Sequence, residues 1–170
     1  MLMGNDIYNK LIELITETFQ MNAYCDNIAY NLDASNYRNV SNIFHHSFAH
    51  KFPELADNIT DMMTKLNARG VRKGLTDETA EYGPLDVPKM FADVLTACKH
   101  YRETIISAID TAEYGGDAEV KLHLEELLLT FLPYLKQADV WSHYASKYEN
   151  DLKSFEIHFE DLTTFIEVIK

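Results

Sequence analysis

The chain has 170 residues and a formal net charge of −12, with 15 Lys and Arg against 27 Asp and Glu. This acidic excess disfavours nucleic acid as a partner, because binding to phosphates needs many basic side chains. The longest uncharged apolar run, residues 127–135, is too short to cross a bilayer, and residues 1–10 lack the features of a secretory signal. We therefore expect a cytoplasmic protein that does not enter membranes and that folds as a single domain over residues 1–170.

Apolar residues recur every three to four positions along several long stretches, which predicts amphipathic helices. The first helix covers residues 6–32 and ends at the turn-forming residues 33–36. The second stretch continues to about residue 66 and ends at Gly70. Pro53 interrupts it, and either kinks one long helix or lies in the first turn of a new one.

The third predicted helix covers residues 88–112, and the fourth covers residues 118–150 with Asp117 as its N-cap. Residues 151–170 predict a short fifth helix. This tail extends a four-helix core of about residues 6–150.

The lengths of the connections predict the topology. The turns near residues 34 and 115 are short, so the first and second helices, and the third and fourth, should pair antiparallel. The middle connection, residues 70–86, could extend to about 56 Å, which exceeds the ~39 Å length of a helix of about 26 residues. We therefore expect an all-α four-helix bundle with a long crossover, in which the second and third helices run parallel.

A short string at the end of the second helix adds a family resemblance. It leads into the crossover and reads Asn67-Ala68-Arg69-Gly70-Val71-Arg72. With the order of the helices, it makes residues 6–140 resemble the ferritin-like superfamily, including its starvation-induced Dps branch. The resemblance implies a homo-oligomer that binds and oxidises iron.

The resemblance to ferritins implies a di-iron centre. Its ligands would be a Glu of the first helix, an ExxH pair of the second, a Glu of the third and polar groups of the fourth. Aligned on the string above, the first three helices place other residues at these positions: Gln20, Leu55, Asn58 and Cys98. On the fourth helix Glu126 fits the pattern. A shift of one helical turn would bring in acidic residues instead: Glu17, Glu54, Asp57 and Asp61. We therefore expect a metal centre that is modified or lost.

The spacing of five polar residues suggests a metal site of another kind. If the helix is continuous through Pro53, these residues line one face: His46, His50, Glu54, Asp57 and Asp61. Two imidazoles with nearby carboxylates could hold iron or another divalent ion, and His45 is a possible further ligand. The Dps branch implies a similar set of two histidines and downstream acids between subunits. The alternative is an exposed polar face that binds no metal.

A second candidate lies on the third and fourth helices. His100 with Glu103, and His123 with Glu126, share a three-residue spacing. Antiparallel pairing of the two helices would place Glu103 opposite Glu126. This arrangement predicts either a carboxylate-bridged metal centre or ordinary surface ion pairs.

Two functions therefore remain open at this stage. The first is a ferritin-like protein that binds iron or protects against oxidative stress, with ferroxidase-type oxidation as a possible activity. The second is a non-catalytic interaction module that uses the apolar fourth helix or the aromatic tail to bind a protein partner. Cys25 and Cys98 have no CxxC partner, so we expect buried, reduced thiols and not a disulfide.

Overall fold

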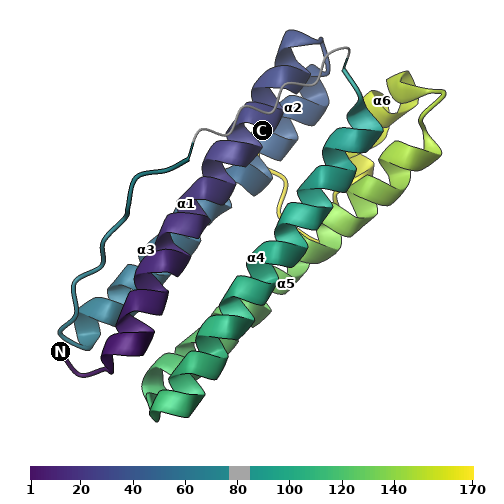
Figure 1. Cartoon of the computed structure of the whole chain (residues 1–170). Coiled ribbons are helices and arrows are strands. Elements are labelled where there is room, and N and C mark those ends of the chain that lie inside the picture. Colours follow the sequence, from purple (N-terminus) through teal and green to yellow (C-terminus); the bar gives the residue numbers. More distant parts are fainter. Residues whose placement is uncertain (77–84) are drawn as a thin grey trace.

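The computed structural model describes residues 1–76 and 85–170, and every regular element in these two ranges is a helix (Figure 1). The elements are α1 (Asn5–Ala34), α2 (Arg38–Phe44), the π-helix η1 (His45–Ala49), α3 (Lys51–Lys65), α4 (Val87–Gly115), α5 (Ala118–Lys147) and α6 (Leu152–Leu162). None of these helices is long and apolar enough to cross a membrane. The prediction of an all-α fold is confirmed.

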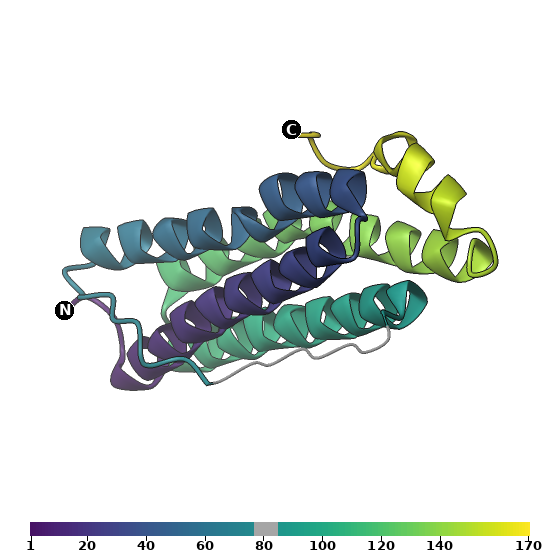
Figure 2. The same ribbon diagram turned by 90° about the horizontal axis from the view of Figure 1, so that it is seen from above.

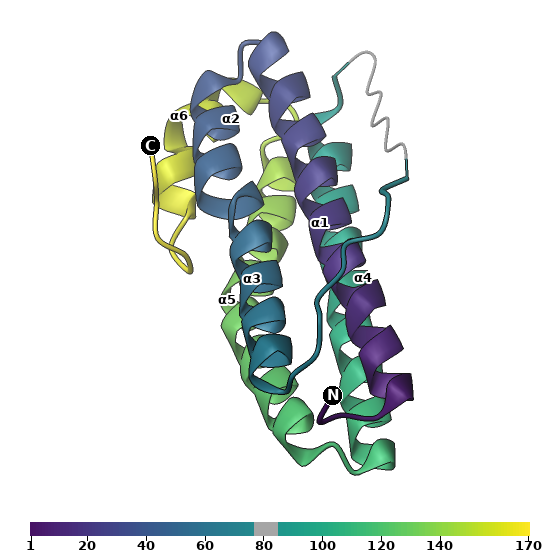
Figure 3. The same cartoon turned by 90° about the vertical axis from the view of Figure 1, so that its left-hand side faces the viewer.

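The helices form a bundle of two antiparallel pairs. α1 pairs with the rod made by α2, η1 and α3, and α4 pairs with α5 (Figures 1 and 2). α3 ends beside the N-terminus of α1, whereas α4 begins at the opposite end of the bundle (Figure 3). The α2–α3 rod and α4 therefore run in the same direction, which confirms the predicted crossover.

The first part of the crossover, residues 66–76, runs along α1. The Tyr8 hydroxyl donates to the Arg69 carbonyl at 3.0 Å, and the Lys73 N–H donates to Thr16 Oγ1 at 3.0 Å. Further along, the Thr76 N–H donates to Gln20 Oε1 at 3.1 Å. The hydrogen-bonding partners on α1 lie progressively later in the sequence, so the segment runs along α1 from its N-terminus toward its C-terminus. The predicted connection also includes residues 77–84, which lie outside the described residues.

Residues 67–72, on which the family resemblance is based, have a structural role at the start of this segment. Asn67 has a φ of 53°, a left-handed conformation that ends α3 and that Asn tolerates better than most residues. A Cβ on Gly70 would lie 2.7 Å from Thr60 Cγ2, so only glycine fits there without a shift of neighbouring atoms. The Arg72 guanidinium lies 4.8 Å from the centre of the Phe19 ring on α1. The string thus turns the chain and seats it against the bundle.

Aromatic side chains fill the core at the end of the bundle where α6 packs. Trp141 on α5 is fully buried, and its ring stacks on Phe159 of α6 with centroids 4.9 Å apart. The same indole lies 5.3 Å from Phe48 and 5.9 Å from Phe91. This cluster therefore joins α5, α6, η1 and α4.

Pro53 explains the π-helix. A proline has no N–H, so the Ala49 carbonyl four residues earlier loses its usual helical donor. Asn22 of α1 replaces that donor, because its Nδ2 donates to the Ala49 oxygen at 3.0 Å. The turn widens at this point, and the His50 N–H reaches the His45 carbonyl at 3.1 Å, five residues back. Since α3 begins at Lys51, Pro53 lies in the first turn of a new helix, as one of the two predicted alternatives required.

Replacement of Asn22 by Leu should destabilise the protein by about 1–2 kcal/mol, because the Ala49 carbonyl then has no donor. In a Pro53→Ala background the same replacement should cost less, since the new N–H of residue 53 can serve that carbonyl. Urea denaturation of the four proteins of this double-mutant cycle measures the coupling. An equal cost in both backgrounds would show that Asn22 does not substitute for the proline's missing donor.

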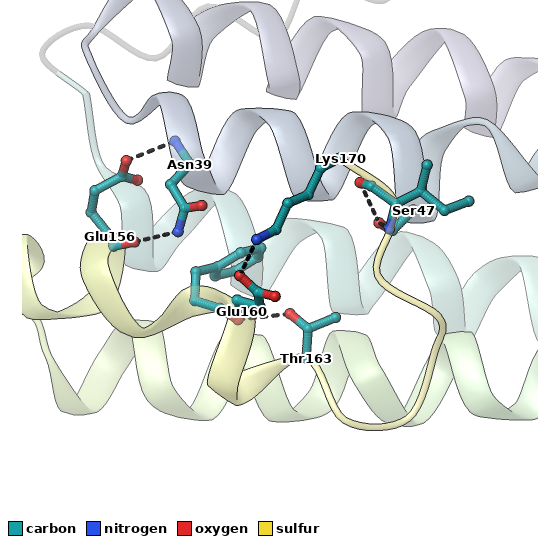
Figure 4. A network of polar contacts seen from close by, with 8 residues as sticks. Asn39, Ser47, Glu156, Glu160, Thr163 and Lys170 are labelled. Atoms are coloured by element: carbon teal, nitrogen blue, oxygen red, sulfur yellow. Dashed lines mark hydrogen bonds and ion pairs between the residues drawn. The ribbon is translucent and has the colours of Figure 1, made fainter.

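The C-terminal tail folds back onto α2 and η1 (Figure 4). The Glu156 carboxylate of α6 accepts hydrogen bonds from the N–H groups of Asn39, at 2.7 Å, and Val40, at 3.0 Å. These donors lie in the first turn of α2 and have no partner within that helix. At the other end, Ser47 Oγ accepts from the Ile169 N–H at 2.7 Å. The predicted short C-terminal helix is confirmed, and the tail after it lies against the π-helix.

Asp117 is the N-cap residue of α5, as predicted, but its side chain makes no bond to that helix. Its Oδ1 instead accepts from the Gly4 N–H at 2.9 Å, just before α1. The hydrogen bond usual for an N-cap Asp is thus absent, and the carboxylate joins the N-terminus of α1 to the α4–α5 turn.

Candidate metal centre

The π-helix gathers three histidines at one point on the bundle. One ligand nitrogen from each of His45, His46 and His50 lies within 4.8 Å of the other two, and no other group of three or more His, Cys, Asp or Glu in the described ranges is this close. In an α-helix, residues 45 and 50 would point about 140° apart. The wider π-turn brings them together, so that His45 Nε2 lies 3.1 Å from His50 Nε2.

α1 contributes an acidic side chain to the same place. Asp26 Oδ1 lies 3.1 Å from His45 Nε2. This oxygen is buried and has no hydrogen-bond partner besides that contact. Asp26 follows Asn22 by one helical turn, and Tyr30 follows by another and packs its ring edge-on against His45, with centroids 5.6 Å apart. One face of α1 therefore supports both the backbone and the side chains of the π-turn.

Burial and mutual repulsion shape the protonation of this cluster. Burial lowers the pKa of His45, the neighbouring His50 and His46 lower it further, and Asp26 opposes this effect. Burial raises the pKa of Asp26, and the nearby His45 partly offsets that rise. His45 therefore favours the neutral imidazole, which is the form that binds metal ions.

The lowered pKa of His45 predicts a pH dependence of stability without metal. The neutral side chain contributes stability above about pH 6.5, the unfolded pKa, and this contribution is lost as the pH falls through the lower folded pKa. Between about pH 7.5 and about pH 5, the metal-free protein should therefore lose more stability than a His45→Gln variant. Urea denaturation at several pH values measures the difference. Parallel curves for the two proteins would exclude His45 as its source.

Two of the five residues predicted to share a helical face belong to this cluster, namely His46 and His50. The other three do not join it: Glu54 pairs with Lys51 at 3.0 Å, and Asp57 and Asp61 are exposed. The prediction was conditional on one continuous α-helix, whereas the structure has a π-helix at His45–Ala49. The π-turn rotates the residues before it relative to those after it, so His45 replaces the downstream acids as a neighbour.

The second predicted set is dispersed in the structure. Glu103 pairs with Arg102 at 2.8 Å, and Glu126 is exposed. His123 Nε2 lies 2.6 Å from Asn58 Oδ1, a contact that joins α5 to α3. Burial lowers the pKa of His123. In the described part of the chain these residues do not come together as a set of metal ligands.

The positions aligned with the ferritin di-iron ligands have other roles. Leu55 and Cys98 are buried, Gln20 binds the crossover at Thr76, and Asn58 contacts His123. In residues 1–76 and 85–170, no His, Asp or Glu side chain belongs to the buried core.

A neutral polar contact is buried between α1 and α4. Thr18 Oγ1 lies 2.7 Å from the Tyr101 hydroxyl. The rings of Phe52 and Phe131 pack around Tyr101 at 5.7 Å and 5.0 Å. A hydroxyl pair among phenyl rings offers no charged ligand to a metal ion.

Cys25 and Cys98 are free and buried, as predicted, and burial raises the pKa of both thiols. Protonated thiols are weak metal ligands, because the thiolate is the binding form. The two cysteines therefore do not extend the candidate site.

Sequence reasoning missed Asp26 and gave His45 only a secondary place. The signal for both was present, because Asn22, Asp26 and Tyr30 recur at four-residue spacing on α1. The second signal was Pro53, whose missing N–H predicts a disturbed turn four residues upstream. Together they indicate a polar face of α1 opposite an irregular helix.

Comparison with known proteins shows similarity in structure alone. No protein-family model matches the sequence, and no curated protein matches it either. Among solved structures, the chain is similar to an open-pore ferritin from the hyperthermophilic archaeon Archaeoglobus fulgidus, with a TM-score of 0.86 and 12% identity over 94% of this chain and 96% of that one. A variant of PmFTN soaked in iron gives a TM-score of 0.79 and 12% identity over 91% of this chain and 99% of that one. The chain therefore has the ferritin-like fold, which confirms the predicted resemblance at the level of structure.

Proposed function

We propose that the chain is a ferritin-like metal-binding protein that holds one divalent transition-metal ion at His45, His46 and His50. The observation that carries this proposal is the convergence of the three ligand nitrogens within 4.8 Å. Similarity to proteins named as ferritins supports a role in handling iron or related metals. We further propose that this role is cytoplasmic and includes protection against oxidative stress.

The geometry of the histidines suits a shared ion. Bonds from a metal such as zinc to imidazole nitrogen are about 2.0–2.1 Å long. His45 Nε2 and His50 Nε2, at 3.1 Å, already lie as far apart as two ligands of one ion. Two nitrogens on one ion lie at most about 4.2 Å apart, so small side-chain rotations complete the set.

The proposal places the metal on the surface of the bundle and not in its core. The aligned core positions carry Leu55 and Cys98, and the buried polar groups near them are the neutral hydroxyls of Thr18 and Tyr101. Hard metal ions such as iron are held by carboxylate and imidazole in such bundles. We therefore propose that the di-iron centre implied by the resemblance is lost.

Exposed leucines on α5 support assembly with another chain. Leu122, Leu129 and Leu132 have 63%, 68% and 52% of their surface exposed. Exposed apolar patches often mark protein contacts. We propose a homo-oligomer that uses this face. The alternative function, a non-catalytic interaction module, uses the same face to bind a different protein.

Elemental analysis and native mass together test the proposed function. Protein stripped with a chelator is incubated separately with Fe²⁺ without oxygen and with Zn²⁺, and is then desalted. We expect about one ion per chain at a nitrogen-rich site of this kind, together with a native mass of several chains. Protein that retains neither ion above the buffer blank, and that sizes as a monomer, would support the interaction module instead.

A further inference from the structure

We infer that Asp26 is the fourth ligand of this site and that the complete set of three imidazoles and one carboxylate selects Zn²⁺ over Fe²⁺. The inference rests on the proposed function, because it concerns the same site. It adds the identity of the fourth donor and the class of ion, and it assigns Asp26 on α1 a role that the histidine spacing does not reveal.

The surroundings of the Asp26 carboxylate favour a bound cation. Its Oδ1 is buried and has no hydrogen-bond partner besides the close contact with His45 Nε2 at 3.1 Å, although buried carboxylate oxygens usually have their hydrogen bonds satisfied. A bound cation would supply a further partner for this oxygen.

The position of this oxygen relative to the His45 ring also favours Asp26 as a ligand. Asp26 Oδ1 and His50 Nε2 each lie 3.1 Å from the same atom, His45 Nε2. An aspartate that only orients a metal-bound histidine contacts the ring nitrogen that faces away from the metal. Here the carboxylate oxygen faces the nitrogen that also faces His50. Asp26 Oδ1 lies outside the group of nitrogens that share the 4.8 Å distance, so a rotation of the Asp26 side chain would bring it to an ion held by His45 and His50.

The number and kind of the donor atoms favour Zn²⁺. Four protein ligands close a tetrahedral site, which is the usual arrangement of structural zinc. For a given set of nitrogen and oxygen donors, Zn²⁺ binds more tightly than Fe²⁺. The nearest downstream carboxylate, Glu54, is paired with Lys51 at 3.0 Å. The cluster thus offers one carboxylate for one ion and no bridging carboxylate for a second.

A bound ion would join two parts of the bundle. Asp26 belongs to α1, whereas the histidines belong to the π-turn between α2 and α3. Binding to the folded state alone raises stability. Zn²⁺ should therefore raise the melting temperature of the stripped protein, and Asp26 should contribute to the increase because it supplies the only ligand from α1.

An anaerobic competition experiment with an Asp26→Asn variant tests the inference. The stripped wild-type protein is titrated with Co²⁺, whose visible bands are strong when four ligands surround it and weak when six do, and is then titrated with Zn²⁺ or Fe²⁺ as competitor. We expect the strong bands in the wild type, displacement by Zn²⁺ at lower concentration than by Fe²⁺, and a loss of Zn²⁺ affinity in the variant of at least about tenfold. Asp33→Asn, at the exposed end of α1, is the matched control and should bind as the wild type does.

A rescue variant separates ligation from a structural role. Asp26→His replaces the carboxylate with another ligand and should restore much of the Zn²⁺ affinity that Asp26→Asn loses, whereas a role in packing alone would not be restored. Wild-type protein that binds none of the three ions would refute the proposed function itself. Wild-type protein that binds Zn²⁺ while Asp26→Asn binds it equally well, or that prefers Fe²⁺, would overturn this inference and leave the proposed function standing.

Discussion

Replacement of both His46 and His50 by Ala should lower the affinity for Zn²⁺ by about 100-fold or more. Loss of supporting groups around a metal typically costs 10- to 100-fold, and here two direct ligands are removed. His50 is exposed and His46 is only partly buried, so the variant should fold. Isothermal titration calorimetry of the stripped proteins measures the change.

The matched control for this prediction is His100→Ala. His100 is an exposed histidine on α4 and lies outside the three-histidine cluster. Its removal should leave Zn²⁺ affinity unchanged. If the His100 variant lost as much affinity as the double variant, the titration would be reporting general surface binding, and the cluster would lose its assigned role.

Replacement of Trp141 by Ala should destabilise the protein by about 3–5 kcal/mol, the usual cost of truncating a large buried aromatic side chain. The indole is fully buried among the rings of Phe48, Phe91 and Phe159, which belong to three other elements. Its Nε1 also donates to Thr163 Oγ1 at 3.1 Å, a bond that fixes the chain just after α6. Chemical denaturation measures the loss.

Leu129→Ala serves as the control, because Leu129 is 68% exposed on the neighbouring surface of α5. In a monomeric preparation its effect should stay within about 0.5 kcal/mol. A Trp141 variant that unfolds at the same denaturant concentration as the wild type would mean that the aromatic cluster does not hold α6 against the bundle.

Much of the fold could be predicted from the sequence, because long amphipathic helices carry their period in the chain. The spacing of apolar residues predicted four of the helices, and the length of the connection after Gly70 predicted the crossover. Asn67 and Gly70 could be recognised as a string, but their roles required coordinates. Only the structure shows the left-handed turn at Asn67 and the close approach of Gly70 to Thr60.

The candidate site was predicted only in part, and the reason is one irregular turn. The spacing of His46 and His50 suggested a metal site because residues four apart share a face of an α-helix. Pro53 and Asn22 together convert the preceding turn into a π-helix, and that change brings in His45. The spacing of residues on a regular α-helix is the same along its whole length, so that spacing alone does not predict this local change.

The four-residue spacing on α1 indicates a polar face that includes Asp26, but it does not show which residue Asp26 contacts. Its closeness to His45 depends on how α1 and the π-turn pack against each other, and this contact spans residues far apart in the chain. The hydrogen bond that Asp117 accepts from the Gly4 N–H could not be predicted for the same reason. Local rules predicted which residues end helices, whereas the partners of their side chains came from tertiary packing.

Anomalous scattering from crystals grown with Zn²⁺, measured at the zinc absorption edge, tests most directly whether the metal lies at the π-turn and not in the core. One strong peak per chain is expected, bounded by His45, His46, His50 and Asp26. A peak in the core beside Thr18 and Tyr101, or none at the three histidines, would contradict it.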